Sequence, residues 1–457
     1  MGKIAINKFT THTGATLHTA SVDYGSDYTL AYDVAFGDRR PCDKVTKHKH
    51  AADGSDFYAP YYISDWGTHN HSLGDVVLIY SGDVIIPDRQ CAVRRSDGSF
   101  YVVFYGRDGT IRKIYLSTSN DGGQTWSTEE VPTGADSANR HYQPVIVVDS
   151  SDNLHIVFRG TIDQATDTHH WSHIIKSSGD EWSEPVTIFQ VSSNSISFNL
   201  AANSHNLAIS SDDTITLSLK YRLSSVDYFL MYEYSGTWSL VDSPTFPEGG
   251  AIYQHQVLYN STGTLFLFYT TYIESTYKLY EQERIDGSWT EPYLVAGGSG
   301  VAVWQIDARC DQSNNLHIAY YWNNSGVGTY GNKYISWTYG GVITEEDISS
   351  YSDDNFGGTA TLAIGDSGCV ISGFTWYTNL GEYSMYYIMH NIRSGAGSWS
   401  AEQRVYPSVD DYGNQADYIV RTSHYHIPDN EIDGTRLFIF SDYANDNLYC
   451  AIMNVGV

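Results

Sequence analysis

Positive charge is scarce in this chain, which carries 26 Lys and Arg against 53 Asp and Glu over 457 residues, a formal net charge of -27. Such an excess of negative charge repels phosphate backbones and anionic lipid surfaces at long range. We therefore expect neither a nucleic acid nor a membrane as partner. A local basic cleft can still attract an anionic glycan, because salt screens more distant charges over about 8–10 Å.

Cysteine is sparse, and apolar runs are short. The five cysteines lie far apart, include no CxxC pair and are odd in number, which predicts neither a disulfide framework nor a structural zinc site. No apolar run is long enough to span a membrane or to form a signal peptide at the start. We expect an extracellular protein, either secreted with a signal missing from this sequence or associated with a virion.

Glycine and aromatic residues are abundant instead. The chain has 40 Gly, 38 Tyr and 11 Trp, together with many short clusters of Ser, Thr, Asn, Asp and Gly. Aromatic residues favour strands, and the small polar residues favour the tight turns between them. This composition predicts an all-β protein.

One unit repeats along the chain: an apolar strand, a polar turn, and a second strand that ends in aromatic residues. Copies begin at Cys91, Pro144, Asn206, Gln256, Ala308, Thr361 and, more loosely, Tyr418. A period of roughly 50–60 residues with four short strands is typical of a propeller blade. The sequence predicts one domain over residues 1–457, a seven-bladed β-propeller of four-stranded antiparallel blades. Residues 87–457 would form the blades, and residues 1–86 would close and cap the ring with an N-terminal strand.

A polar turn ending in Trp follows most copies. The turn at residues 119–126 matches the S-x-D-x-G-x-T-W pattern called the Asp box, which resembles the turns of sialidases and other propellers. Its carboxylate and hydroxyl groups are expected to tie the turn while the Trp packs between sheets. This pattern predicts architecture and lies away from the usual site.

Propeller geometry predicts where functional groups gather. The loop before the first strand of each blade and the loop between its second and third strands emerge on one face. Polar residues in these loops are Asp88, Arg89, Arg140, His141, Tyr142, Arg159, His169, His170, Asn203, His205, Arg222, Tyr253, Gln254, His255, Gln305 and Asp307. We expect His, Tyr and Arg side chains to converge at one end of the ring axis.

That set of side chains suits β-elimination of a uronic acid. The reaction needs a base for the C5 proton, a proton donor for the departing glycosidic oxygen, and a cation that neutralises the carboxylate. Histidine or tyrosine can move the protons, and the planar fork of Arg binds a carboxylate in bidentate fashion.

The stretch from His141 to Arg222 resembles the BNR-repeat propellers that include ulvan lyases, which cut a sulfated algal polysaccharide. The resemblance implies a catalytic His at the start of an inner strand, a second His in the following loop, and then a Tyr and an Arg from the next blade. His141, His169 and Arg222 stand in the corresponding places. The Tyr position departs from the pattern, and either His205 or Ser204 could stand there.

The resulting hypothesis is a lyase acting on a uronate-containing, ulvan-like polysaccharide. His141 and His205 would share the acid and base roles. His169 would position the substrate or neutralise its charge, and Arg222 would hold the carboxylate. The substrate would also contact Arg89, Tyr142, His170, Asn203, Tyr253, Gln254, His255 and Gln305. The polysaccharide, endo or exo action and the oligomeric state stay open.

Two other functions are considered. The chain could be a glycan-binding propeller of a phage virion without turnover. It could also be a sialidase-like hydrolase, although residues 85–89 read Ile-Ile-Pro-Asp-Arg and lack the Arg that precedes Ile-Pro in sialidases.

No cofactor and no metal ligand is predicted, although a structural or site-associated divalent ion stays open. The H-x-H pairs formed by His48 and His50 and by His69 and His71 could each reach one ion from an extended strand, but solvated loop histidines are the favoured interpretation.

Overall fold

The computed structural model describes a defined part of the chain, and every statement below concerns that part. It comprises residues 4–10, 16–23, 29–35, 47–49, 56–58, 72–82, 90–136, 139–162, 168–192, 196–197, 205–223, 226–247, 251–298, 300–324, 326, 328–338, 341–352, 356–364, 370–379, 384–393, 397–400, 403–406, 420–421, 435–442 and 447–454. All of its regular elements are β-strands. No membrane-crossing helix is found among these residues.

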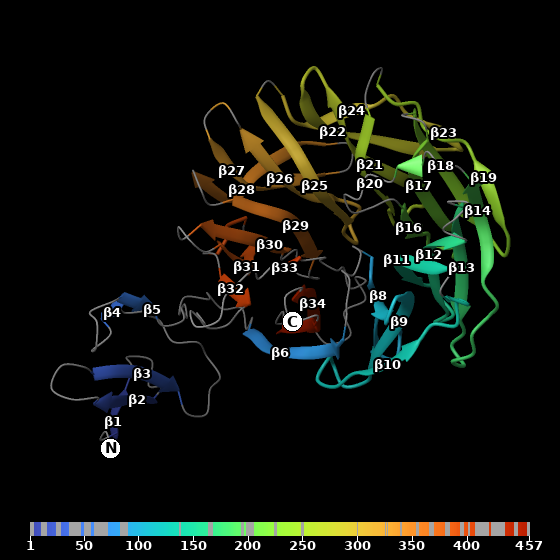
Figure 1. The fold of residues 1–457 in the computed structure, drawn as a ribbon. Coiled ribbons are helices and arrows are strands. Elements are labelled where there is room, and N and C mark those ends of the chain that lie inside the picture. The colour runs from blue at the N-terminus through green and yellow to red at the C-terminus, as the bar shows by residue number, and fades with distance from the viewer. Residues whose placement is uncertain are drawn as a thin grey trace.

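Six antiparallel sheets are each built from strands that follow one another along the chain, and they stand around a common axis (Figure 1). The first three blades comprise β7 (Ala92–Arg94), β8 (Phe100–Asp108), β9 (Ile111–Ser119) and β10 (Ser127–Glu130); β11 (Arg140–Val148), β12 (Leu154–Ile162), β13 (Thr168–Lys176) and β14 (Val186–Ser192); and β15 (Ile196–Ser197), β16 (His205–Ile209), β17 (Ile215–Leu223), β18 (Val226–Tyr234) and β19 (Trp238–Val241).

The next three blades follow the same plan. They comprise β20 (Ala251–Tyr259), β21 (Leu265–Ile273), β22 (Thr276–Ile285), β23 (Ser288–Trp289) and β24 (Tyr293–Ala296); β25 (Val301–Cys310), β26 (Leu316–Asn324), β27 (Thr329–Trp337) and β28 (Ile343–Ser352); and β29 (Phe356–Ile364), β30 (Val370–Asn379), β31 (Ser384–Arg393) and β32 (Gln403–Tyr406). The first long strands of neighbouring blades contact one another, for example β20 with β25, so they form the inner ring.

The remaining large sheet joins the two ends of the chain. It contains β33 (Val420–Arg421), β34 (Thr435–Asp442) and β35 (Asn447–Asn454), and β35 pairs with β6 (Ser72–Ser81). The predicted number of seven blades is wrong, because the structure shows six blades. The predicted closure by an N-terminal strand is confirmed, since β6 precedes residue 87 and pairs with β35 of the last repeat. The all-β propeller and its four-stranded antiparallel blades are confirmed.

Two small sheets lie earlier in the chain. β1 (Ile4–Thr10), β2 (Thr16–Asp23) and β3 (Thr29–Ala35) pair in that order, and β4 (Lys47–Lys49) pairs with β5 (Asp56–Tyr58). The predicted capping role of this segment, and residues 50, 69 and 71 of the H-x-H pairs, fall outside what the structure describes.

The apolar core lies between neighbouring blades, because each sheet is buried on both faces. One cluster joins Phe104 of the first blade to Phe158 of the second and to Leu437 of the closing sheet. Another joins Trp171 of the second blade to Leu217 and Tyr221 of the third. Burial of such large side chains contributes about 1.5–3 kcal/mol each, so the contacts between blades are the main source of stability.

The hairpins that join the first and second strands link three pairs of neighbouring blades. Asp152 accepts hydrogen bonds from the backbone nitrogen and the hydroxyl of Ser96, and Asp213 accepts the same pair from Ser150. Asn314 likewise accepts hydrogen bonds from the backbone nitrogen and the hydroxyl of Ser261. The three acceptors share a φ of 62°, a left-handed conformation that Asp and Asn tolerate better than most residues.

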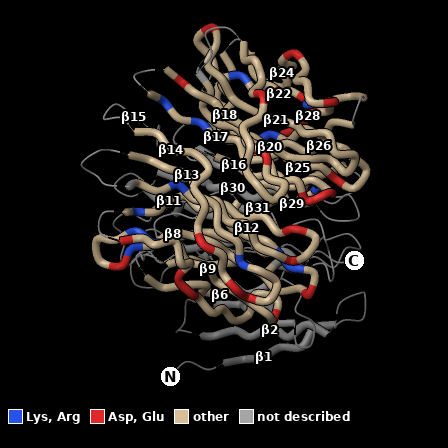
Figure 2. The backbone as a smooth tube through the Cα atoms, turned by 90° about the vertical axis from the view of Figure 1, so that its right-hand side faces the viewer, with Lys and Arg blue, Asp and Glu red and all other residues tan. Residues whose placement is uncertain are grey.

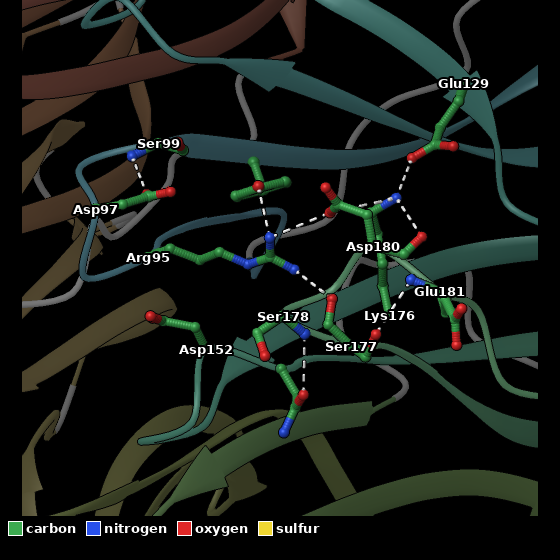
Figure 3. Close-up of polar contacts among 12 residues, drawn as sticks. Arg95, Asp97, Ser99, Glu129, Asp152, Lys176, Ser177, Ser178, Asp180 and Glu181 are labelled. Atoms are coloured by element: carbon green, nitrogen blue, oxygen red, sulfur yellow. Dashed lines mark hydrogen bonds and ion pairs between the residues drawn. The ribbon is translucent and has the colours of Figure 1, made fainter.

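An arginine near the first hairpin adds a second link (Figure 3). Arg95 donates to the Tyr101 hydroxyl at 2.9 Å, to the Ser177 carbonyl at 2.9 Å and to Asp180 at 3.2 Å. Its guanidinium is buried, and it joins the first blade to the turn after β13. We call this side of the ring the turn face. The opposite side, where first strands begin and second strands meet third strands, is the entry face.

The turn at residues 119–126 is tied internally, as its sequence predicts. Asp121 accepts hydrogen bonds from the backbone nitrogens of Gln124 and Thr125 and from the Thr125 hydroxyl. These bonds lower the pKa of Asp121 to about 2. The Trp126 indole donates to the Gly123 carbonyl at 2.9 Å and packs against the core cluster that includes the closing sheet.

Candidate functional site

Tyr142 lies at the entry face between two guanidinium groups. The Cζ atom of Arg112 is 4.8 Å from the centroid of its ring, and the Cζ atom of Arg159 is 5.3 Å from it. Arg112 comes from β9 of the first blade, whereas Tyr142 and Arg159 belong to the second. We call these three residues the Tyr142 cluster. Guanidinium groups bind anionic groups well, so the two beside this ring make the surroundings of Tyr142 favourable for a negatively charged ligand.

A β-bulge sets the direction of the Tyr142 side chain. Tyr142 pairs with Arg159, but the register between β11 and β12 shifts between Tyr142 and Val145. Gln143, inside the bulge, has a φ of 49°. A bulge bends its strand and redirects a side chain, which is why bulges recur beside functional sites. Here the ring also meets Tyr105 of the first blade, at 6.1 Å between centroids.

His141 and His170 form a second feature of the same blade. Their ring centroids are 5.6 Å apart and their planes are perpendicular. Gly160 is the register partner of both residues, so the three lie side by side on β11, β12 and β13. The Nδ1 atom of His141 hydrogen-bonds to the Thr133 hydroxyl at 2.7 Å. Burial lowers the pKa of both imidazoles to about 4, so both are neutral at pH 7.

His169 points to the opposite face of β13 from His170, because successive residues of a strand alternate. It lies beside Thr161, with 3.4 Å between its Nδ1 atom and the hydroxyl oxygen. The sequence assigned catalysis to His169 and substrate contact to His170, whereas the structure places His170, not His169, against His141.

His205 is buried, at 2% exposure, close enough to Arg159 of the Tyr142 cluster for the charge of that guanidinium to act on it. Its Nδ1 atom accepts a hydrogen bond from the Trp171 indole at 3.3 Å. Burial, and then the nearby Arg159 guanidinium, lower its pKa to about 3. The hydrogen bond between His205 and Trp171 therefore ties the third blade to the second.

Arg222 is engaged by a carboxylate of its own hairpin. Its Nε atom donates to Asp227 at 2.8 Å and its second terminal nitrogen donates at 2.7 Å, a bidentate pair that raises the pKa of Arg222. Arg222 and His141 share no contact residue in the described chain. His141 contributes to the gap between the first and second blades, and Arg222 lies on the side of the third blade that faces the fourth. The prediction that these two hold one sugar unit together is therefore not supported by their contacts.

Lys220 is a half-buried cation near the same hairpin. Its Nζ atom donates to the Tyr253 carbonyl at 3.2 Å and lies 5.7 Å from the centroid of the Tyr253 ring. Burial lowers its pKa to about 8, with Asp227 acting in the opposite direction.

The predicted residues of the fourth and fifth blades divide into two kinds. Tyr253 is half-buried at the entry face, as is Gln305. Gln254 is buried and accepts from the Ile306 nitrogen at 3.3 Å. His255 is buried against Phe229, with 5.0 Å between ring centroids. Gln254 and His255 thus stabilise the contacts between blades.

Arg89, Asn203, Ser204 and Asp88 lie outside the described residues, as do the residues 85–89 compared with sialidases. Sequence reasoning missed Arg112 and Lys220. Arg112 follows the hairpin between the second and third strands of the first blade, so the loop rule could have found it. Lys220 precedes Arg222 by two positions and so shares its face of the strand.

Blue segments, which mark Lys and Arg, lie at the left-hand ends of the blades near β8, β11 and β17 (Figure 2). Within the described part of the chain, no group of three or more His, Cys, Asp or Glu residues could hold a metal ion.

Comparison with known proteins agrees with this architecture. Residues 64–226 match the BNR repeat-like domain. No curated protein sequence matches the chain.

Solved structures with a similar arrangement have low sequence identity. One is a protein of unknown function from Dyadobacter fermentans DSM 18053, with 10% identity, a TM-score of 0.49, and coverage of 84% of this chain and 99% of that one. Another is the polysaccharide lyase Uly1, with 13% identity, a TM-score of 0.49, and coverage of 82% and 92%. The Hadza microbial sialidase Hz136 has 15% identity, a TM-score of 0.46, and coverage of 79% and 71%. The chain is thus a β-propeller by its own ring of antiparallel blades, and residues 64–226 of it are similar to the BNR repeat-like domain.

Proposed function

We propose that this protein binds an acidic polysaccharide at the entry face and cleaves it by β-elimination at the Tyr142 cluster. The observation that carries the proposal is the presence of two guanidinium groups, those of Arg112 and Arg159, within 4.8 and 5.3 Å of the Tyr142 ring centroid. Cations gathered in this way, in a chain of net charge -27, favour a ligand with a carboxylate or a sulfate group.

The proposed reaction breaks two bonds of a uronate unit and forms one. A base removes the C5 proton, the electron pair forms the C4–C5 double bond, and the C4–O bond breaks with proton transfer to the departing oxygen. Arg112 and Arg159 neutralise the carboxylate, which makes the C5 proton more acidic. We assign the proton transfers to Tyr142 and His141. As carboxylate ligand we propose Arg159 in place of Arg222, to which the sequence had assigned that role.

His205 and His170 then have supporting roles. His205 lies beside Arg159, which lowers its pKa further after burial, and it holds Trp171 of the second blade. His170 packs against the His141 ring. In this proposal both are positioning residues, because neither touches the substrate.

The test is to incubate the protein with ulvan and other uronate polymers and to follow the ultraviolet absorbance of the unsaturated product. Arg112→Ala should lower kcat/KM by about a hundredfold, since losing a charge-assisted contact costs about 1.5–3 kcal/mol. Lys113→Ala is the matched control. Lys113 follows Arg112 in β9, so its side chain points to the opposite face of the strand, where it pairs with Asp108 and Glu130 at 2.9 Å each. Equal activity of both variants would remove the Tyr142 cluster from the proposal.

Glycan binding without turnover is the second candidate. The observation that favours it is the burial of the imidazoles, since His141 and His205 are only 3% and 2% exposed. A protein that binds uronate polymers through Arg112 and releases no unsaturated product from any of them would have this function. In either case we propose an extracellular protein, secreted or carried by a virion.

A further inference from the structure

An aromatic residue followed by Gln recurs at one position of the repeat. The pairs are Tyr142-Gln143, Tyr253-Gln254 and Trp304-Gln305. Each aromatic residue stands seven positions before the residue that opens the next turn, namely Asp149, Asn260 and Asp311. The backbone nitrogen of each of these turn residues donates to the carbonyl four positions later, so the three turns are equivalent.

Each of the three pairs sits at a β-bulge of a first strand. The register shifts between Tyr142 and Val145 in β11, between Ile252 and Gln254 in β20, and between Trp304 and Ile306 in β25. Gln305 has a φ of 46°, close to the 49° of Gln143. In β20 the residue without a register partner is Tyr253 itself, whereas Tyr142 and Trp304 are paired and the irregularity follows them. All three aromatic residues nevertheless stand beside a bulge near the start of a first strand, so the second, fourth and fifth blades each place an aromatic residue at the entry face.

The three rings are half-buried and have neighbours suited to a ligand. Tyr142 lies between Arg112 and Arg159. Tyr253 lies above Lys220 and meets the edge of Tyr277 at 4.6 Å between centroids.

Trp304 also packs against Tyr277. It contacts Tyr277 at 3.6 Å between centroids. Tyr272, which is 41% exposed, meets Tyr277 at 4.9 Å. The fourth and fifth blades thus share an aromatic surface of four rings at the entry face.

We infer that Tyr142, Tyr253 and Trp304 belong to three subsites that bind successive parts of one extended polysaccharide chain around the entry face. This inference rests on the proposed function and adds where the rest of the polymer lies. The charged unit occupies the Tyr142 subsite, and sugar rings stack on Tyr253 and on the pair Tyr277 and Trp304. Aromatic faces suit this role because they offer a large, rigid apolar surface to the C–H face of a sugar.

The experiment measures affinity by calorimetry for a disaccharide and for a long oligosaccharide of the same uronate polymer. The wild-type protein should bind the long ligand much more tightly. Trp304→Ala should weaken binding of the long ligand by about tenfold, which corresponds to roughly 1.4 kcal/mol, and leave the disaccharide affinity unchanged. Trp304→Tyr should restore most of the loss, because it restores a stacking face. The long ligand should also change the tryptophan fluorescence of the wild-type protein.

Tyr293→Ala is the matched control, because Tyr293 is 50% exposed on the outer strand β24 and lies away from the first strands. It should leave both affinities unchanged, and thermal unfolding should show that each variant is folded. If the long and short ligands bind equally and Trp304→Ala has no effect, the subsites are wrong while the Tyr142 cluster stands. If neither ligand binds the wild-type protein, both proposals are wrong.

Discussion

The imidazoles of His141 and His170 meet at right angles, with 5.6 Å between ring centroids, because Gly160 between them carries no side chain. A Cβ atom at Gly160 would lie 2.2 Å from Cε1 of His170 and 2.8 Å from Cδ2 of His141. The absence of a single methyl group therefore decides that these two rings share one gap between blades.

Gly160→Ala should force the two rings apart and lower the free energy of unfolding by about 1–3 kcal/mol, the usual cost of overpacking. Thermal or urea unfolding measures the effect. Gly298→Ala is the control, because a Cβ atom there would meet nothing within 4 Å. Equal stability of the two variants would show that the histidine rings move apart freely.

The link between Ser96 and Asp152 should contribute to the stability of the ring. Asp152→Gly keeps the left-handed conformation but removes both accepted hydrogen bonds, so it should lower the unfolding free energy by about 1–2 kcal/mol. Asp152→Asn retains an acceptor and tolerates the same φ, so it should lose less. An Asp152→Gly variant as stable as the wild type would show that the link is not needed.

Stability should fall as the pH drops below about 6.5, because several buried imidazoles resist protonation in the folded state. The pKa values of His173, His205 and His255 are lowered to about 3, chiefly by burial. The unfolded chain takes up these protons near pH 6.5 and the folded chain does not, so the stabilisation is complete above pH 6.5 and is lost below it. Between about pH 3 and pH 6.5, each of these groups lowers the free energy of unfolding by about 1.4 kcal/mol for each unit by which the pH falls.

His255→Phe tests this explanation. The Nδ1 atom of His255 has no hydrogen-bond partner among the described residues, and Phe fills a similar space. Urea unfolding between pH 5 and pH 6.5 should show a slope smaller by about one proton in this variant. An unchanged slope would mean that His255 is protonated in the folded state.

Glu281 should act in the opposite sense. Its carboxyl is buried at 3% exposure, and burial raises its pKa to about 8 from 4.5. The folded state keeps this proton while the unfolded state releases it, so stability is lost as the pH rises from 4.5 to 8. Glu281→Gln should be more stable than the wild type at pH 8 by about 2–4 kcal/mol, with little difference at pH 4.

The control for Glu281 is Glu274→Gln, which changes an exposed carboxylate paired with Lys278. It should alter stability by well under about 1 kcal/mol, as exposed ion pairs do. A Glu281→Gln variant that loses stability at pH 8 would show that the ionised carboxylate is favourable where it lies.

Arg222→Ala should reduce kcat/KM far less than Arg112→Ala, by less than about threefold, because the Arg222 guanidinium is held by Asp227. Steady-state kinetics on the cleaved uronate polymer, with both variants side by side, measures the difference. A loss as large as that of Arg112→Ala would return Arg222 to the carboxylate site predicted from the sequence.

Local patterns in the sequence determined the architecture. Strand alternation and the spacing of turn residues such as Asp149 and Asp311 act within about twenty residues, so the repeat shows them directly. The same alternation places Arg159 and Tyr142 at the entry face. Closure of the ring by an N-terminal strand was also predicted, and β6 supplies it by pairing with β35. The number of blades was predicted wrongly, because counting repeats does not show how the last repeat packs beside its neighbours.

Which residues lie next to each candidate site residue was decided only by the tertiary structure. His169 and His170 are adjacent in sequence, and which of them meets His141 depends on the strand register and on Gly160. Arg112 reaches Tyr142 from another blade, whereas Arg222 is engaged by Asp227 across its own hairpin. A strand period assigns a side chain to a face, but the packing of separate blades determines which charges and rings that face meets.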